Sequence, residues 1–149
     1  MTKLLIAVLL LLPASPFLQE DESQQAVRLA IAKRYDEALA VLHPLLARNP
    51  DDAQIYYLIG LCYLQLKDLE RSVRYLEASV ANRPQFPKPY LWLANAYLMQ
   101  EKPEKAREIV TQGLKRFPRH EPLLQLQEGI RSQESGIRKK EGGDRQVVG

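Results

Sequence analysis

Cysteine is almost absent from this sequence, which has a single one, Cys62, among its 149 residues. A lone thiol forms no internal disulfide framework, and its place in an apolar helical stretch indicates a small buried residue. The two histidines, His43 and His120, lie far apart and have no partner at metal-ligand spacing. We therefore expect neither a disulfide-stabilised fold nor a metal site.

Motifs of the common enzyme classes are also missing. The sequence has no Gly-rich phosphate loop, no paired-cysteine zinc motif and no nucleophile elbow. It consequently offers no candidate catalytic residue and no cofactor site. We expect no enzymatic activity and no small-molecule substrate.

Long hydrophobic runs are limited to one, Leu4 to Leu12, which spans only 9 residues. Crossing a bilayer takes about 20 residues as a helix, but a run of this length after Lys3 suits the apolar core of a secretory signal. Pro13 to Pro16 follow and make a poor cleavage site, since Leu12 stands where a small residue is preferred. We predict that residues 1–18 are a signal peptide or an N-terminal hydrophobic segment. The protein is then exported, to a periplasm or the medium, or is held at a membrane if the segment stays uncleaved.

What the sequence does contain is a repeat. Two adjoining stretches of 34 residues, Ala53 to Phe86 and Pro87 to His120, match at eight positions when each is numbered from one. Positions 4, 7, 8, 11, 20, 24, 27 and 32 hold Tyr56 and Tyr90, Ile59 and Leu93, Gly60 and Ala94, Tyr63 and Tyr97, Ser72 and Ala106, Leu76 and Val110, Ser79 and Gly113, and Pro84 and Pro118. At 3.6 residues per turn, the first four positions fall on one stripe of a helix, and positions 20, 24 and 27 on one stripe of a second helix. The pattern predicts two antiparallel helices per stretch, which approach where the small residues at positions 8 and 20 face each other.

This pattern resembles the tetratricopeptide repeat, in a protein of the exported bacterial type. The resemblance implies an all-α fold, an α-solenoid of about three helix-turn-helix repeats. Three repeats are expected because one helix pair cannot bury its apolar stripe without neighbours.

Both ends of the array are predicted to depart from the repeat. Residues 19–52 form a degenerate first repeat, because Glu22 and Gln25 occupy positions that are apolar in the second repeat, residues 53–86. After the third repeat, residues 87–120, apolar side chains at helical spacing predict a capping helix over residues 121–132. Residues 133–149 have few apolar side chains and are predicted to be a disordered tail.

Local signals predict where several helices begin. The first helix is expected to begin near Ser23, Asp68 to cap the second helix of its repeat, and Pro103 to take a first helical position. Pro44 is expected to kink its helix after Ala40, because proline removes a backbone donor.

Charge is uneven along the chain. Formal charges add to −3 in residues 19–52, +1 in residues 53–86 and +4 in residues 87–120. Such a gradient can steer an acidic partner to the third repeat or favour head-to-tail self-association. An ordinary solvated helical surface explains it as well, because acidic residues interrupt the basic ones. With no continuous basic stripe, nucleic acid is not an expected partner.

Positions 2, 5, 9, 12 and 13 lie opposite the buried stripe of each first helix, on the side that lines the concave groove in this family. This side is unusually apolar, and apolar patches mark interaction sites. The predicted partner-binding residues are Tyr57, Leu61, Leu64, Lys88, Leu91, Trp92, Asn95, Leu98 and Met99, and the first repeat adds Val27 and Ile31. The alternative is that packing between repeats, or the N-terminal segment, covers these side chains.

Co-chaperones of the family grip a C-terminal carboxylate with Lys and Asn on this face. Here positions 5 and 9 hold Ser23 and Val27, Tyr57 and Leu61, and Leu91 and Asn95, of which only Asn95 is of the right type. The resemblance therefore implies a non-enzymatic protein-protein interaction scaffold that binds an apolar helix or an extended peptide in its groove. The alternative is a structural, self-assembling subunit of a cell-envelope complex. The identity of the partner stays open.

Overall fold

The computed structural model describes residues 21–144, with the backbone alone at residues 134 and 137–144. The described residues form helices and no strands. In chain order the helices are α2 (Glu22–Ile31), α3 (Tyr35–Arg48), α4 (Ala53–Gln65), α5 (Leu69–Ala81), α6 (Lys88–Met99), α7 (Pro103–Arg116) and α8 (Glu121–Asp144). The predicted N-terminal segment, residues 1–18, lies outside the described residues.

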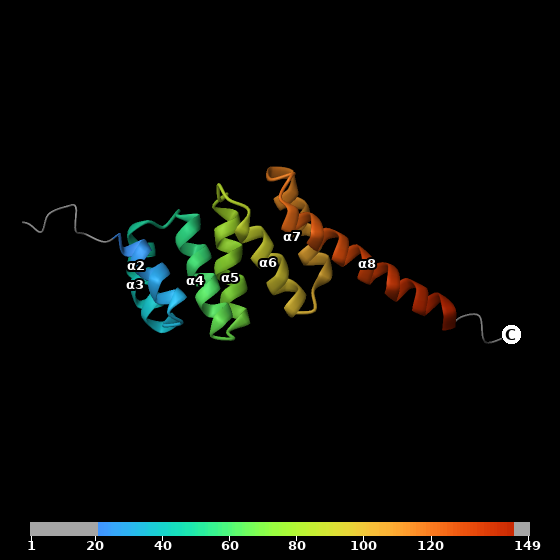
Figure 1. Cartoon of the computed structure of the whole chain (residues 1–149), viewed down its shortest axis with the longest axis horizontal. Helices are drawn as coiled ribbons and strands as arrows, with labels where there is room; N and C mark the ends of the chain where they lie inside the picture. Colours follow the sequence, from blue (N-terminus) through green and yellow to red (C-terminus); the bar gives the residue numbers. More distant parts are fainter. Residues whose placement is uncertain (1–20, 145–149) are drawn as a thin grey trace, which may run out of the picture.

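Each helix packs against the next one in the chain, and α2 also contacts α4, as α6 contacts α8. Figure 1 shows the resulting row, which runs from α2 and α3 at one end to α8 at the other. Three helix pairs, α2 with α3, α4 with α5 and α6 with α7, correspond to the three predicted repeats. The all-α solenoid expected from the sequence is thus confirmed.

Small residues bring α4 and α5 together, as the repeat pattern predicts. A Cβ atom added to Gly60 would lie only 2.8 Å from Cγ of Leu76. Next to this contact, the hydroxyl of Ser72 donates a 2.8 Å hydrogen bond to the carbonyl oxygen of Gly60. In the third repeat Ala94 and Ala106 are fully buried at the same positions. Positions 8 and 20 therefore set how closely the two helices of a repeat approach.

The turn between the two helices of each repeat contains a left-handed residue that the sequence did not predict. It falls at position 15 in all three repeats, and the residues are Lys33, Lys67 and Glu101, with φ of 60°, 65° and 59°. The N–H of the next residue donates, over 2.9 Å in each case, to the carbonyl oxygen five residues back. This bond closes the end of the first helix in a Schellman motif. Glycine usually marks such a turn, and without one the motif left no signal in the sequence.

Helix starts follow the predicted signals closely. Helix α2 begins at Glu22 with Asp21 accepting from the Ser23 N–H, Asp68 caps α5 by accepting from the Arg71 N–H, and Pro103 is the first residue of α7.

Helix α3 runs unbroken from Tyr35 to Arg48 through Pro44. Because Ala40 and Pro44 are both exposed, water can satisfy the carbonyl that proline leaves without its donor.

Helix α4 takes part in two hydrophobic clusters. Ile55, Ile59 and Cys62 pack with residues of α2 and α3 in one cluster. Tyr57, from another side of the same helix, packs with residues of α5 and α6 in the second cluster. The helix is therefore covered on two sides.

Helix α8 extends well beyond its predicted end at residue 132. Leu123 and Ile130 are buried in the core, so its first half caps the array as expected. The prediction of a disordered tail is wrong for residues 133–144, which continue the helix away from the array (Figure 1). A shortage of apolar residues argues against packing but not against helix formation, because Gln, Glu, Arg and Lys are good helix formers. Residues 145–149 lie outside the described residues.

Candidate functional site

An apolar groove runs across the first helices of the repeats. It consists of two hollows, of about 520 and 340 Å³, that share Val27 of α2 and Leu58 and Leu61 of α4. The larger hollow is completed by Gln54, Tyr57, Phe86, Pro87, Lys88 and His120. The smaller one is completed by Ala30, Ile31, Tyr35, Cys62, Gln65 and Trp92. Because the hollows share three residues, we treat them as one site and call it the apolar groove.

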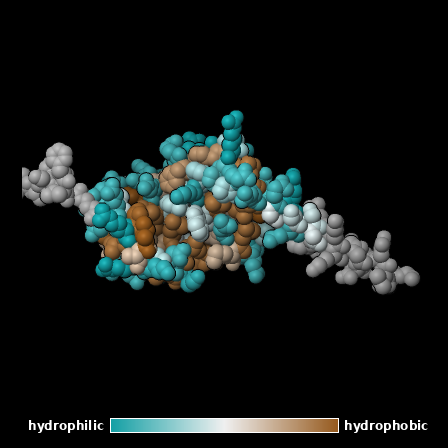
Figure 2. Space-filling view, in the orientation of Figure 1, coloured by the Kyte–Doolittle hydropathy of each residue, from teal (hydrophilic) through white to brown (hydrophobic). Residues whose placement is uncertain are grey.

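The surface view agrees with a partly uncovered apolar face. Figure 2 shows hydrophobic residues gathered over the middle of the array, bordered by hydrophilic ones. Among the described residues, the large hydrophobic side chains that are clearly exposed are Ile31, Leu66 and Met99. Each lies where the first helix of a repeat ends.

Four of the predicted binding residues line the apolar groove. These are Tyr57, Leu61, Lys88 and Trp92. Val27 and Ile31, which the sequence placed on the same face, line it too. The repeat pattern therefore located the middle of the groove.

The other predicted residues lie elsewhere. Leu91, Asn95 and Leu98 are half-buried on α6, and Met99 is 58% exposed at its end. Tyr57 and Leu64 are each only 8% exposed, so packing between repeats covers most of both side chains. The repeat pattern predicts one buried stripe on α4, whereas in the structure the neighbouring repeats cover this helix on two sides.

Tyr57 forms the floor of the groove. Its ring meets the ring of Phe86 edge-on, with the centroids 5.5 Å apart. Burial raises the pKa of Tyr57, and a hydrogen bond with Trp92 opposes this. The side chain is thus held in place from α6 and from the turn before it.

The sequence reasoning missed Leu58, Phe86, Pro87 and His120. Phe86 and His120 both occupy position 34, the last residue of their repeats, and both line the larger hollow. The sequence has no recurrent residue type at that position, and a helical wheel says nothing about residues in turns.

A third hollow, of about 380 Å³, adjoins the groove at Pro87 and His120. Its other lining residues are Arg116, Phe117, Pro118 and Arg119. Arg116 donates a 3.0 Å hydrogen bond to the hydroxyl of Tyr90 and lies 5.6 Å above the Phe117 ring. We call this hollow the basic pocket.

Chemical reactivity at the groove is low. Burial raises the pKa of the Cys62 thiol to about 11, so the thiolate is scarce at neutral pH. Within residues 21–144, no group of three or more His, Cys, Asp or Glu side chains could hold a metal ion. Among the same residues, no helix has the length and hydropathy needed to cross a membrane.

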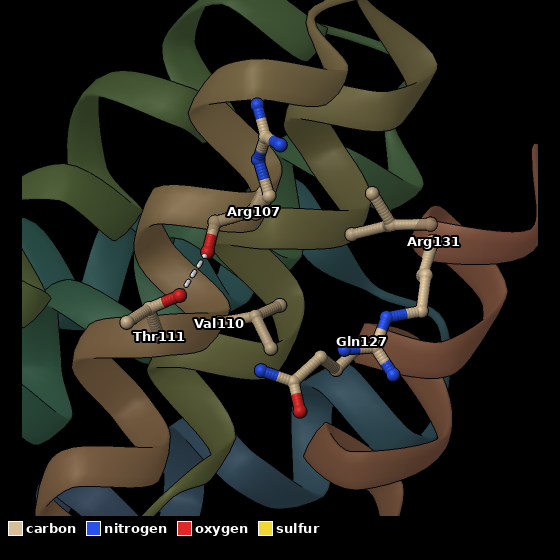
Figure 3. Close-up of a pocket in the computed structure, with 6 residues that line it drawn as sticks. Arg107, Val110, Thr111, Gln127 and Arg131 are labelled. Atoms are coloured by element: carbon tan, nitrogen blue, oxygen red, sulfur yellow. Dashed lines mark hydrogen bonds between the residues drawn. The ribbon is translucent and has the colours of Figure 1, made fainter. Parts of the chain in front are cut away.

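A further hollow of about 280 Å³ lies between α7 and α8. Gln127 and Arg131 face Val110 across it, but the side chain of Arg107 points away (Figure 3). Arg131 is paired with Glu128 at 3.3 Å. The two guanidinium groups therefore do not converge on a common ligand position.

Helix pairs stacked in a row around an apolar groove define an α-solenoid built to contact other molecules. Two models of the tetratricopeptide repeat match this chain, over residues 25–87 and 68–130. The chain belongs to the tetratricopeptide repeat family.

Curated relatives are much longer than this chain. It is 29% identical over 129 residues to the Hsp70-Hsp90 organizing protein of Triticum aestivum and 26% identical over 129 residues to Hsp70-Hsp90 organizing protein 3 of Arabidopsis thaliana. Each match covers 87% of this chain, but only 22% and 23% of the relatives. The chain thus spans about a fifth of the length of these relatives.

Solved structures share the fold. MamA 41-end from Desulfovibrio magneticus RS-1 is 26% identical with a TM-score of 0.61, covering 67% of this chain and 56% of that one. The first TPR of Spaghetti (RPAP3) bound to an HSP90 peptide gives a TM-score of 0.70 at 17% identity, covering 76% and 90%. The Yersinia enterocolitica chaperone SycD in complex with a peptide of the translocator YopD gives 0.67 at 14%, covering 86% and 97%. The last two likenesses concern the fold alone.

Proposed function

We propose that this protein is a non-enzymatic scaffold that binds an apolar helix or an extended peptide of a partner protein in the apolar groove. The observation that carries the proposal is the pair of hollows joined by Val27, Leu58 and Leu61, which makes one continuous apolar site across α2, α4 and α6. A bound peptide would bury its own apolar side chains there, and that burial is the main source of affinity for such a groove.

The relatives support peptide binding in general. Two of the similar structures are complexes with peptides, one from HSP90 and one from a translocator. The HSP90 peptide, SRMEEVD, ends in acidic residues. This chain has Tyr57 and Leu61 where co-chaperones of the family have Lys and Asn, so an apolar anchor suits its groove better than that peptide.

A selection from a random peptide library displayed on phage tests the proposal. The bait is the whole chain, compared with Leu61→Glu in the groove and with Leu66→Glu, a matched change at the end of α4 outside it. We expect the wild type and Leu66→Glu to enrich the same peptides with apolar anchors, and Leu61→Glu to lose them. Recovery of the same peptides on Leu61→Glu would reject groove binding.

A second groove variant guards against misfolding. Val27→Gln changes a half-buried side chain of α2 and should also weaken the selected peptides. Far-UV circular dichroism and thermal unfolding check that each bait is folded. If Leu61→Glu does not fold, the result with Val27→Gln decides.

The alternative is a self-assembling structural subunit. The observation that favours it is the row of exposed apolar side chains, Ile31, Leu66 and Met99, at equivalent ends of the first helices. Light scattering coupled to size-exclusion chromatography tests it over a range of concentrations. A mass that rises with concentration in the wild type, but not in Leu66→Ser/Met99→Ser, would support assembly through these helix ends, and a constant monomer mass would reject it.

Export also remains a proposal, based on Lys3 and the apolar run from Leu4 to Leu12. Fusing residues 1–20 to a reporter enzyme that is active only outside the cytoplasm tests it. Activity that is lost when Leu9 and Leu10 are changed to Arg is the expected result. An equally active Arg variant, or an inactive wild-type fusion, would contradict export.

A further inference from the structure

The three hollows beside α4 and α6 adjoin one another in a series, which we call the path. The smaller apolar hollow joins the larger through Val27, Leu58 and Leu61, and the larger joins the basic pocket through Pro87 and His120. A single extended peptide can therefore lie across all three. Its two ends would meet very different surroundings.

Charged groups that line this path are confined to one end. Lys88 lines the larger hollow near its junction, and Arg116 and Arg119 line the basic pocket. No Asp or Glu is among the described residues that line the three hollows, and the smaller hollow has no charged lining residue at all. We propose that the groove binds its peptide in one direction, with the apolar part of the peptide along α2 and α4 and an acidic part over Lys88, Arg116 and Arg119. This inference rests on the proposed function.

The guanidinium of Arg116 is already held in place. Its Nη1 donates to the hydroxyl of Tyr90 at 3.0 Å, and its plane lies above the Phe117 ring. A guanidinium that is oriented in advance loses less side-chain entropy when it binds a carboxylate, and the fork of N–H groups fits that anion. Arg119 is exposed in the following turn and is free of the core.

His120 supplies a second, independent observation at the junction. Its Nδ1 atom is buried and has no hydrogen-bond partner among the described residues. A buried ring nitrogen without a partner is unfavourable, so the described residues leave this imidazole unsatisfied. The place that lacks a partner is thus the place where the path changes from apolar to basic.

This acidic subsite differs from the carboxylate grip of the family's co-chaperones. That grip uses positions 5 and 9 of the first helices, which here hold Tyr57, Leu61 and Leu91 among others. The basic pocket instead lies at the turn between α7 and α8, at the end of the third repeat. Of the basic residues in 87–120, Arg116 and Arg119 line this pocket and Lys88 lines the hollow that adjoins it.

The test uses peptides recovered from the random phage library on the wild-type chain. Each is synthesised unchanged, with an amidated carboxyl terminus, and with every Asp and Glu replaced by Asn and Gln. Fluorescence polarisation measures binding to the wild type, to Arg116→Gln/Arg119→Gln and to Lys102→Gln/Lys115→Gln. The last variant removes the same charge from the third repeat without touching the pocket, so it controls for long-range attraction.

We expect the peptides without Asp and Glu to bind the wild type roughly tenfold more weakly than the unchanged peptides do. The unchanged peptides should lose a similar factor when they bind Arg116→Gln/Arg119→Gln. The control variant should bind like the wild type. If amidation alone causes the loss, the acid is the C-terminal carboxylate, and if not, it is an acidic side chain. Arg119→Gln alone, an exposed change, should show part of the loss if the double variant does not fold.

Two failures are distinguishable. Recovery of no peptide that depends on Leu61 would reject groove binding itself. Peptides that depend on Leu61 but bind equally well without their acidic groups, or equally well to the Arg variant, would overturn the acidic subsite and leave groove binding intact.

Discussion

Helices α4 and α6 occupy the same place in consecutive repeats, but they are buried differently. At position 5, Tyr57 of α4 is 8% exposed, whereas Leu91 of α6 is half-buried. At position 12, Leu64 is buried and Leu98 is half-buried. The repeat pattern decides which face of each helix meets its own partner, while the neighbouring repeats decide how much of the other face is left open. A face that is partly open in one repeat can therefore be part of the core in another.

Truncation at position 5 should show the largest difference between the two helices. Tyr57→Ala removes a buried ring that packs on Phe86, and we expect the free energy of unfolding to fall by about 3 kcal/mol. Leu91→Ala removes a half-buried side chain and should cost about 1 kcal/mol. Urea unfolding followed by circular dichroism measures both. Equal losses would contradict the difference in burial, and Tyr57→Phe, which keeps the ring, is the control.

Position 8 should show the next largest effect. Gly60→Ala places a Cβ atom 2.8 Å from Leu76, and we expect a net loss of about 1–2 kcal/mol in spite of the better helix propensity of alanine. The reverse change in α6, Ala94→Gly, should cost about 1 kcal/mol through propensity and lost packing.

A double variant tests whether steric overlap between the new Cβ atom and Leu76 causes the loss of stability in Gly60→Ala. Gly60→Ala/Leu76→Ala removes the Cγ and Cδ2 atoms that the added Cβ would meet at 2.8 and 3.0 Å, so its loss should be smaller than the sum of the two single losses. If the two single losses in unfolding free energy simply add, the close approach of α4 to α5 does not limit the size of the residue at position 8.

The N-termini of α4 and α6 differ, because only α4 has a side-chain cap. The side chain of Asp52 accepts from the Gln54 and Ile55 N–H groups at 2.8 and 3.2 Å, whereas Pro87, before α6, makes no side-chain cap. Asp52→Ala should lower the free energy of unfolding by about 1 kcal/mol, and Asp52→Asn by clearly less. Thermal unfolding of both variants measures this. A loss with Asn as large as with Ala would point to the charge and away from the cap.

Position 10 should show the smallest effect, confined to alkaline pH. Burial raises the pKa of Cys62 to about 11 from its ordinary 9.0, and α6 has Ala96 there. The folded chain then keeps a proton that the unfolded chain releases, so stability falls as pH rises from about 9 to 11. Unfolding measured against pH in the wild type and in Cys62→Ala checks the sign. A steeper decline in the wild type is expected, and parallel curves would reject it.

Much of the fold was predictable because it depends on local periodicity. The stripe that contains Ile59 and Leu93 follows from helical spacing, and the prolines at position 32 mark where each repeat ends. Asp68 and Pro103 set helix starts through contacts only a few residues long. The left-handed turns at Lys33, Lys67 and Glu101 escaped because no glycine marks them.

The candidate site was predictable only in part. Leu61 and Trp92 were found because they stand on the stripe opposite the core. Phe86 and His120 were missed because they belong to turns, whose direction depends on how the repeats stack. The length of α8 was not predictable from composition, because a polar composition opposes packing more than helix formation.

The sequence by itself determined the helical repeat, its number of copies and the buried stripe of each helix, since these depend on contacts within 34 residues. Only the tertiary structure decided that Tyr57 and Leu64 are buried, that position 34 of two successive repeats lines one hollow, and that Arg116, Arg119 and His120 lie at the end of the apolar groove. The physical reason is that stacking brings together residues from different repeats. Their arrangement depends on the rotation between repeats, which a helical wheel does not contain.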